Sequence, residues 1–223
     1  MELLHLAIDT STSKPAAALL RGEQVLHEWI GPEGVRHHET LLAGVNECLE
    51  KSGFPLNDLA YLSVGVGPGM FTGLRIGITT AKFLADPLGI PCVAVSSLLA
   101  LAYQSKRLEK DVVCAVSDAK AKRVYALRLA PGEAPPDWSA PAGEEIASTP
   151  EEAARLMKPG DFLIGEGAQI YRELWPLGVQ LAAAPTLSAA AVGILGAKRY
   201  ALGFTTSAND IQPTYLKTGQ GHL

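Results

Sequence analysis

Two aspartates, Asp9 and Asp118, each end an apolar run and are followed by small or polar residues. Asp9 leads into Thr10-Ser11-Thr12-Ser13, whose hydroxyls and backbone N–H groups are suited to a phosphate, while the carboxylate is suited to a magnesium-bound water. An ordinary turn is the alternative, since such side chains also bond to their own backbone. Asp118 can equally be a capping or turn aspartate. The candidate nucleotide-binding residues are Asp9, Thr10, Ser11 and Asp118.

A glycine-rich segment, Gly67-Pro-Gly-Met-Phe-Thr-Gly-Leu-Arg-Ile-Gly77, follows the apolar run 59–66. Gly69, Gly73 and Gly77 recur every four residues, and Ala81 continues the row, so a helix places them on one face. A glycine inside a helix costs about 1 kcal/mol relative to alanine, so this face needs an explanation. A face without side chains lets another backbone come close.

Two explanations of the bare face stay open: docking of a partner, or tight packing against the protein's own sheet. We favour the partner, since Phe71, Leu74 and Ile78 are free to serve the core. A phosphate loop is a further alternative, because the segment leads into a helix N-terminus. However, it lacks the lysine and hydroxyl that end a Walker loop, and its glycines do not have Gly-x-Gly-x-x-Gly spacing.

No metal site is expected. His37, His38 and Glu39 are adjacent at the start of a predicted helix, and adjacent side chains diverge, whereas ligands on a helix need a spacing of three or four. We predict a solvated first helical turn there. Cys48, Cys92 and Cys114 lie far apart in the sequence, which indicates buried thiols in a reducing compartment.

The elements that position these residues follow the order β-β-β-α-β-α-β-α and then begin again. The expected strands are 3–8, 16–20, 25–30, 59–66, 92–95, 112–116, 124–129 and 162–164. The expected helices are 41–52, 71–85, 98–103, 151–157 and 187–202, and 211–217 is expected to extend back across the molecule. The second half repeats a strand, an aspartate turn and a hairpin return, so we expect an α/β fold with mixed sheets and packed helices.

The composition narrows the function classes. With 223 residues, 48% apolar residues and a net charge of −4, the chain is expected to be a packed protein that does not grip nucleic acid by bulk charge. We expect a cytoplasmic protein without a leader peptide or membrane span. One weaker hypothesis is direct nucleic-acid binding by basic residues, namely Lys106, Arg107, Lys110, Lys120, Lys122 and Arg123.

Several of these motifs occur together and in order: Asp9-Thr10-Ser11, His37/Glu39-Leu41-Leu42, the glycine segment Gly67–Gly77, Val95-Ser96-Ser97-Leu98, Asp118-Ala119 with Val124-Tyr125, and Pro213-x-Tyr215-Leu216. Together they resemble the TsaB (YeaZ) family over essentially the full chain. The resemblance implies an actin/Hsp70/sugar-kinase (ASKHA) fold of two related lobes. We place the lobe boundaries at 1–104 plus 206–223 for the partner-binding lobe and at 105–205 for the other.

The resemblance also implies a role in forming N6-threonylcarbamoyladenosine (t6A) at position 37 of tRNAs that read codons starting with A. In that family the catalytic subunit is the paralogue TsaD, which carries the metal-binding histidines and is expected to hold ATP and metal. This chain is then a non-catalytic scaffold without a cofactor of its own. Its implied partners are TsaD in a heterodimer and TsaE in a ternary complex, with tRNA bound only through the complex and a homodimer in isolation.

The implied partner interface combines the glycine face with two helices. Its expected residues are Leu41, Leu42, Val45, Leu49, Gly69, Met70, Phe71, Gly73, Leu74, Gly77 and Ala81. Met70 and His38 depart from the serines common in the family, and Ala119 replaces the glycine of phosphate-binding relatives. The alternative function is an ASKHA-type small-molecule kinase or ATPase that uses Asp9 and Asp118. Nothing in the sequence supplies a nucleophile–base set for the peptidase activity once assigned to the family.

Overall fold

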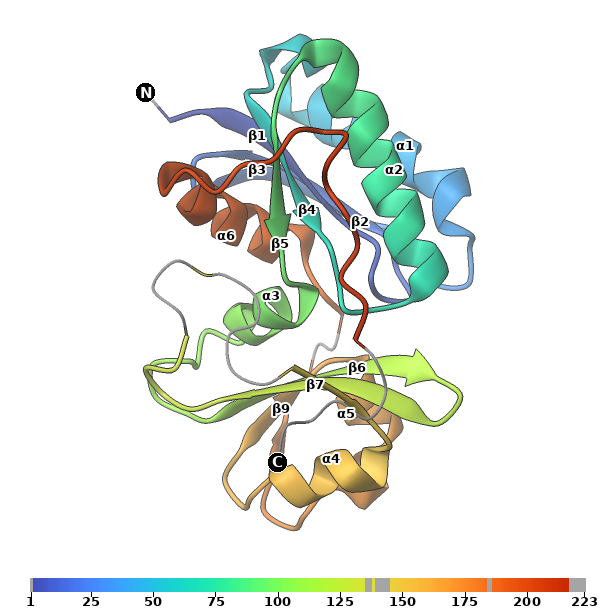
Figure 1. The fold of residues 1–223 in the computed structure, drawn as a ribbon, viewed down its shortest axis with the longest axis vertical. Helices are drawn as coiled ribbons and strands as arrows, with labels where there is room; N and C mark the ends of the chain where they lie inside the picture. Colours follow the sequence, from blue (N-terminus) through green and yellow to red (C-terminus); the bar gives the residue numbers. More distant parts are fainter. Residues whose placement is uncertain (1, 135–137, 139–144, 184–185, 217–223) are drawn as a thin grey trace.

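Residues 2–134, 138, 145–183 and 186–216 are described by the structure, a computed structural model, and they form two lobes (Figure 1). The first lobe is built on a five-stranded sheet of order β3-β2-β1-β4-β5. Its strands are β1 (Leu4–Asp9), β2 (Ala16–Arg21), β3 (Gln24–Ile30), β4 (Tyr61–Gly65) and β5 (Cys92–Val95). The β1–β2 and β2–β3 pairs are antiparallel, whereas β4 and β5 are added in parallel.

The second lobe repeats this topology with the order β10-β9-β6-β7-β8. Its strands are β6 (Val113–Lys120), β7 (Arg123–Leu129), β8 (Glu145–Ser148), β9 (Phe162–Ile164) and β10 (Gln180–Leu181). Again an antiparallel meander is extended by parallel strands on its other edge. The shared topology confirms the repeat that the two aspartate turns indicate in the sequence.

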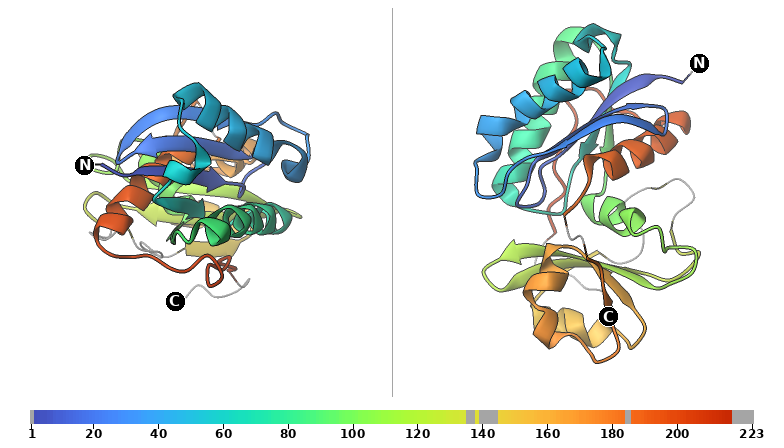
Figure 2. Two further views of the ribbon diagram at one scale, coloured as in Figure 1. Left: turned by 90° about the horizontal axis from the view of Figure 1, so that it is seen from above. Right: turned by 180° about the vertical axis from the view of Figure 1, so that it is seen from behind.

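Helices cover both faces of the first sheet (Figure 2). The helices are α1 (His37–Ser52), α2 (Phe71–Leu88), α3 (Ser97–Gln104), α4 (Pro150–Leu156), α5 (Glu166–Ile170) and α6 (Ala189–Ala201), with 3-10 turns at Leu56–Asp58 and Arg172–Leu174. Leu6 and Ile8 of β1 face α1 and α2, and Ala7 between them faces α6, because successive side chains of a strand point to opposite faces. All six residues of β1 are therefore buried.

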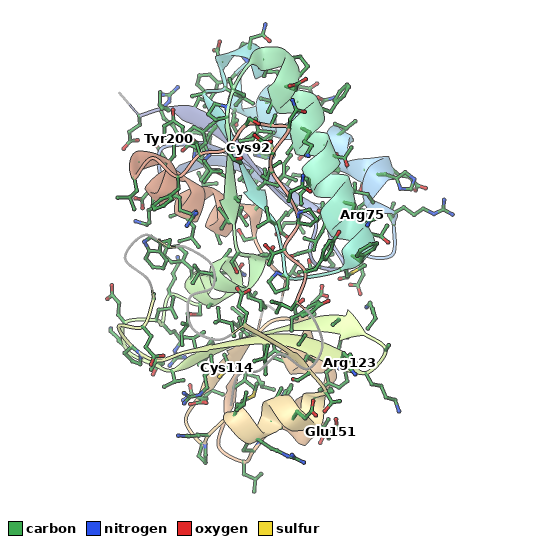
Figure 3. All side chains as sticks on the ribbon, in the orientation of Figure 1. Arg75, Cys92, Cys114, Arg123, Glu151 and Tyr200 are labelled. Atoms are coloured by element: carbon green, nitrogen blue, oxygen red, sulfur yellow. The ribbon has the colours of Figure 1, made fainter. Side chains whose placement is uncertain are left out.

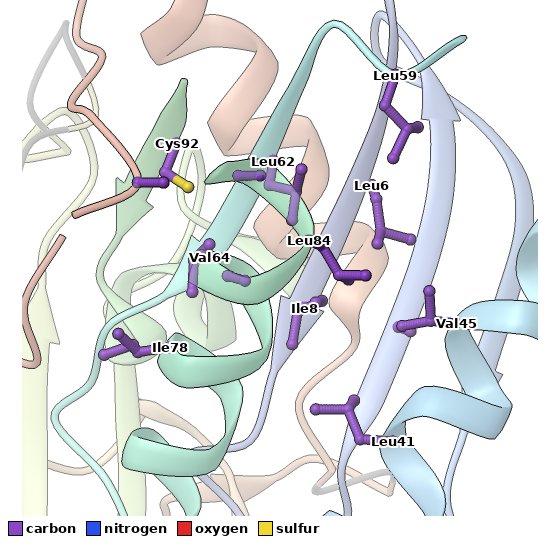
Figure 4. Packing of buried hydrophobic residues seen from close by; sticks show 14 of the residues in the cluster. Leu6, Ile8, Leu41, Val45, Leu59, Leu62, Val64, Ile78, Leu84 and Cys92 are labelled. Carbon is purple, nitrogen blue, oxygen red and sulfur yellow. The ribbon is translucent and has the colours of Figure 1, made fainter. Parts of the chain in front are cut away.

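The core between the first sheet and its two outer helices is apolar (Figure 4). Leu41 and Val45 of α1, and Ile78 and Leu84 of α2, point toward Leu6, Ile8, Leu62 and Val64 of the sheet. Helix α3 lies between the two sheets and contacts β6, β7 and α6. No helix within the described residues combines the length and apolar character needed to cross a membrane.

The structure corrects several predicted boundaries. Helix α2 continues through Pro87 to Leu88, because the cap is Gly89, whose left-handed φ of 63° lets its N–H reach the last carbonyls. Strand β6 runs through Asp118 to Lys120 and does not end before the aspartate. Helix α6, placed by the predicted boundary at residue 205 in the second lobe, packs on β1, β2 and β4 of the first. Of the segment 211–217, residue 217 lies outside the described residues.

A buried histidine makes the fold sensitive to acid. His5 is fully buried, its ring stacks on Tyr61 at 4.4 Å between centroids, and its Nε2 lies 2.9 Å from the Gly22 carbonyl oxygen. Burial lowers the pKa of His5 from 6.5 to about 4. The unfolded chain therefore binds a proton that the folded chain does not, so the free energy of unfolding is expected to fall as pH decreases from 6.5 toward 4.

The expected slope from this residue approaches about 1.4 kcal/mol per pH unit within that window. Urea unfolding of the wild type at pH 7, 6 and 5 measures it. His5→Gln is expected to flatten the dependence, whereas the same change at the exposed His38 leaves the slope as it is. An equal slope for wild type and His5→Gln would contradict the assignment.

Candidate functional site

The glycine face of α2 is covered by the protein's own chain. A Cβ atom at Gly73 would overlap the carbonyl oxygen of Thr10, and one at Gly77 would overlap the Thr10 hydroxyl. At Gly69 a Cβ would overlap Ser11. The Thr10 hydroxyl donates to the Gly73 carbonyl oxygen over 2.8 Å, and the Met70 N–H donates to the Ser11 carbonyl oxygen. The prediction that this face is free for a partner is wrong: the turn between β1 and β2 occupies it.

Most of the predicted interface residues are likewise buried in the monomer. Their exposed fractions are 1% for Leu41, Val45 and Leu74, 9% for Leu49 and 0% for Ala81. Leu42 is 47% exposed and Phe71 is 52% exposed, and Met70 is partly exposed. Only these three side chains of the predicted set are available to another molecule, because the others hold α1 and α2 on their own sheet.

What α1 and α2 expose is their outer surface. Leu42 lies on the flank of α1 that turns toward α2, and Ile76 and Phe83 lie on the facing flank of α2, as the positions of the buried residues on each helix require. Phe83 is 69% exposed. We call the exposed and partly exposed residues of this region the two-helix surface: Leu42, Ala43, Asn46, Ile76, Thr79 and Phe83.

The opposite flank of α2 is covered by the C-terminal segment (Figures 1 and 3). The Phe71 ring lies 5.2 Å from that of Tyr215, and the Arg75 guanidinium lies 3.9 Å from the Phe71 centroid. Lys82 Nζ donates to the Asn209 carbonyl oxygen over 2.8 Å. Phe71 is 52% exposed, but one side of its ring is held by its own chain, whereas no ring contact or hydrogen bond is found for the side chains of Phe83 and Leu42 in the described residues.

Asp9 is a structural carboxylate at the carboxyl end of β1. Its Oδ1 accepts from the Ser11 N–H (2.8 Å) and hydroxyl (2.7 Å), and its Oδ2 accepts from the Ser97 hydroxyl (2.8 Å). It is 1% exposed, and burial raises its pKa while the hydrogen bonds from Ser11 and Ser97 act in the other direction. Asp9 thereby ties the end of β1 to the first residue of α3.

Asp118 shapes the β6–β7 hairpin. Its Oδ1 accepts from the Lys120 N–H (3.1 Å) and the Tyr171 hydroxyl (3.3 Å), and its Oδ2 lies 2.8 Å from Lys120 Nζ. The hydrogen bond to Asp118 raises the pKa of Lys120. Asp118 is only 6% exposed. Its burial and its bonds within the hairpin favour the interpretation of Asp118 as a turn aspartate.

The residues around the β1–β2 turn do not fit a nucleotide phosphate. The Glu166 carboxylate lies against this turn: it accepts from the Ser13 hydroxyl and from the Ser13 N–H, whose distances to Oε1 and Oε2 are 3.3 and 3.4 Å. A phosphate there would meet a like charge. The candidate set Asp9, Thr10, Ser11 and Asp118 is also engaged in bonds within the chain. Whether nucleotide binds stays a prediction of the alternative function.

The basic residues do not form one surface. Lys106, Arg107 and Lys110 precede β6, whereas the other three basic residues lie at its far end: Lys120 ends β6, Lys122 is in the hairpin turn and Arg123 begins β7. The eight residues of β6 separate the two groups by about 26 Å at 3.3 Å per residue. Arg107 is paired with Asp111 at 2.5 Å, and Lys120 with Asp118. Direct tRNA binding would therefore rely on two small, separate basic groups, each partly neutralised by an aspartate, and not on one basic patch.

The four histidines within residues 2–216 offer neither a metal cluster nor a reactive pair. Within the residues that the structure describes, no group of three or more metal-ligating side chains comes together. His37 is 7% exposed and not solvated as predicted, since its Nε2 donates to the Ser13 carbonyl oxygen over 3.3 Å. Ser63 and His5 lie 3.3 Å apart, but both are fully buried and out of a substrate's reach.

Comparison with known proteins agrees with this architecture. Residues 31–202 match the family model described as "TsaD: tRNA N6-adenosine threonylcarbamoyltransferase". The Escherichia coli "tRNA threonylcarbamoyladenosine biosynthesis protein TsaB" is 31% identical, over 95% of this chain and 94% of its own. A crystal structure from Pseudomonas aeruginosa, described as similar to the peptidase YeaZ, superposes with a TM-score of 0.79 at 29% identity, over 96% of this chain and all of the other.

A more distant solved structure shares the fold alone. The ethanolamine utilization protein EutJ from Carboxydothermus hydrogenoformans has a TM-score of 0.54 at 10% identity, over 86% of this chain and 90% of the other. The fold is thus the two-lobed ASKHA fold that the sequence resemblance predicts. In both lobes an antiparallel meander with parallel strands added at one edge is the repeated unit.

Proposed function

Because this chain belongs to the TsaB (YeaZ) family of tRNA threonylcarbamoyladenosine biosynthesis proteins, we propose that it acts in t6A formation as a non-catalytic subunit that binds and activates TsaD. The observation that carries the proposal is the two-helix surface. Phe83 is 69% exposed and Leu42 is 47% exposed, on two neighbouring helices of the first lobe. Exposed apolar side chains gathered in this way are typical of protein–protein interaction sites.

The occupant proposed for this surface is the matching helix pair of TsaD. Residues 31–202 match the TsaD family model, so the two proteins share the part of the fold that carries α1 and α2. Two related helix pairs can meet as a four-helix bundle, with Leu42, Ile76 and Phe83 in its centre. In isolation a second copy of the chain would cover the same residues, and a homodimer results.

Support for a non-catalytic role comes from what the polar groups do. Asp9 accepts three hydrogen bonds within the chain, and Asp118 is bound by Lys120 and Tyr171. In this proposal TsaD holds ATP and metal, and TsaE joins the two proteins in a ternary complex. The chain itself makes no direct contact with tRNA. Its place is the cytoplasm, where tRNA is modified. The alternative, a nucleotide-dependent enzyme, draws no support from these contacts.

Reconstitution with each subunit left out tests this role. With TsaD, TsaE, ATP, tRNA and a threonylcarbamoyl donor, omission of this chain is expected to abolish t6A, and the chain without TsaD is expected to form none. Mass spectrometry of digested tRNA measures the product. An Asp9→Asn variant that remains folded should retain activity. Full t6A formation without this chain, or by this chain without TsaD, would contradict the proposal.

A further inference from the structure

One polar contact joins residues 153 positions apart and connects the two lobes. Ser13 lies in the β1–β2 turn of the first lobe, and Glu166 is the first residue of α5 in the second. The Glu166 carboxylate accepts from both the hydroxyl and the N–H of Ser13. Hydrogen bonds to a charged group are about twice as strong as those between neutral groups.

The second lobe holds Glu166 in a fixed position. A Cβ atom at Gly165 would overlap the carbonyl oxygen of Val116, and one at Gly167 would come within 3.0 Å of the Ser117 carbonyl carbon. Gly165 also has a φ of 117°, which other residues rarely adopt. Helix α5 therefore lies directly on β6 and cannot move independently of the second sheet. Any movement of the Glu166 backbone relative to Ser13 is therefore a movement of one lobe relative to the other.

In the first lobe, the β1–β2 turn that contains Ser13 contacts both α1 and α2, the helices that carry the two-helix surface. The Ser13 carbonyl oxygen accepts from Nε2 of His37, the first residue of α1. Three residues earlier, Thr10 lies in the space left by Gly73 and Gly77 of α2. The N-terminal parts of α1 and α2 thus pack on the β1–β2 turn. Glu166 of the second lobe binds the same turn through Ser13.

We propose that Glu166 is a latch: it holds the two lobes together through Ser13 and thereby fixes the position of the β1–β2 turn, on which α1 and α2 pack. The second half of this proposal rests on the proposed function, since it concerns the helices that would bind the partner. The carboxylate takes the position at the turn that an anionic ligand would otherwise use, so a closed pair of lobes needs no ligand. Lys120 adds a positive charge near Glu166. The pKa of Lys120 is raised first by the hydrogen bond that it donates to Asp118, and the negative charge of Glu166 raises it further.

The latch itself is tested by the distance between the lobes. Spin labels at Glu50→Cys in α1 and Glu151→Cys in α4 report that distance by double electron–electron resonance, since both positions are exposed and the three native cysteines are buried. Glu166→Ala is expected to broaden the distribution and move it to longer distances. Glu173→Ala is the control, because Glu173 is exposed and bonds only to Arg172 in the described structure. A distribution for Glu166→Ala equal to that of the wild type overturns the latch.

The coupling to the docking helices is tested by affinity. Glu166→Ala is expected to weaken binding of purified TsaD about 5- to 10-fold, at the low end of typical couplings between distant sites, while Glu173→Ala binds as the wild type does. Opened lobes with an unchanged Kd overturn the coupling. If the wild type itself fails to bind TsaD, the proposed function fails, and the distance measurement still decides the latch.

Discussion

Replacing Phe83 by aspartate is expected to weaken binding of TsaD by about 30-fold or more, because a central apolar side chain of an interface can account for about 2 kcal/mol or more. Phe83 is 69% exposed, so the substitution removes no core contact and should leave the free energy of unfolding nearly unchanged. Leu42→Asp, on the facing flank of α1, is expected to act in the same direction. Isothermal titration calorimetry measures the Kd, and urea unfolding verifies the fold.

Leu177→Asp provides the matched control. Leu177 is a 93% exposed apolar residue on the second lobe, away from α1 and α2, so it carries the same change of charge and polarity without touching the proposed interface. Size-exclusion chromatography of each isolated variant tests the homodimer: Phe83→Asp should elute as a monomer. Binding of TsaD that is weakened equally by Leu177→Asp and Phe83→Asp would show that charge, and not the two-helix surface, is responsible.

Gly73→Ala is expected to destabilise the isolated chain by about 1–3 kcal/mol, the cost typical of overpacking. In an exposed helix the same substitution stabilises by about 0.5–1 kcal/mol, so the sign of the effect distinguishes two accounts of the glycine face. The structure places the Thr10 carbonyl oxygen where the new methyl group would lie. Gly73→Leu, which the partner-facing interpretation predicts to fold normally, should then fail to fold.

Urea unfolding of Gly73→Ala beside Thr79→Ala gives the comparison. Thr79 is exposed on the same helix, so its replacement should change the free energy of unfolding by only a few tenths of a kcal/mol. A Gly73→Ala variant as stable as the wild type, or more so, would mean that the β1–β2 turn does not rest on α2.

The sequence predicts local structure well where periodicity and caps agree. The strands Cys92–Val95 and Phe162–Ile164 have the predicted bounds, and α1 ends before Gly53 as its glycine indicates. Spacing also shows that Gly69, Gly73 and Gly77 share a face. It does not show what covers that face, because a close backbone neighbour from the same chain and one from a partner require the same small residues. In the structure, residues of the same chain cover this face.

Long-range contacts explain what the sequence alone does not reveal. Glu166 and Ser13 are 153 residues apart, and neither has a neighbour in the sequence that indicates the other. Helix α6 carries an alanine- and glycine-rich pattern compatible with either sheet, and its position follows from Gly193 against Leu20 and Gly196 against Ser63. Phe83 is not among the predicted interface residues. Its helical spacing from the buried Leu84 and Ala85 places it on the outer flank of α2, so the sequence does contain a signal for its exposure.

Thiol footprinting of the two-helix surface tests the central claim most directly. The three native cysteines give little background, because burial raises the pKa of Cys48 and Cys114 to about 12 and that of Cys92 to about 11. Cysteines introduced at Ala43, Thr79 and Glu151 are exposed and should alkylate readily. Of these positions, Glu151 is labelled in Figure 3. Added TsaD is expected to slow alkylation at Ala43→Cys and Thr79→Cys by about 10-fold or more, as burial in an interface excludes the reagent, and to leave Glu151→Cys unchanged. Unchanged rates at positions 43 and 79 in a chain that binds TsaD would contradict the account.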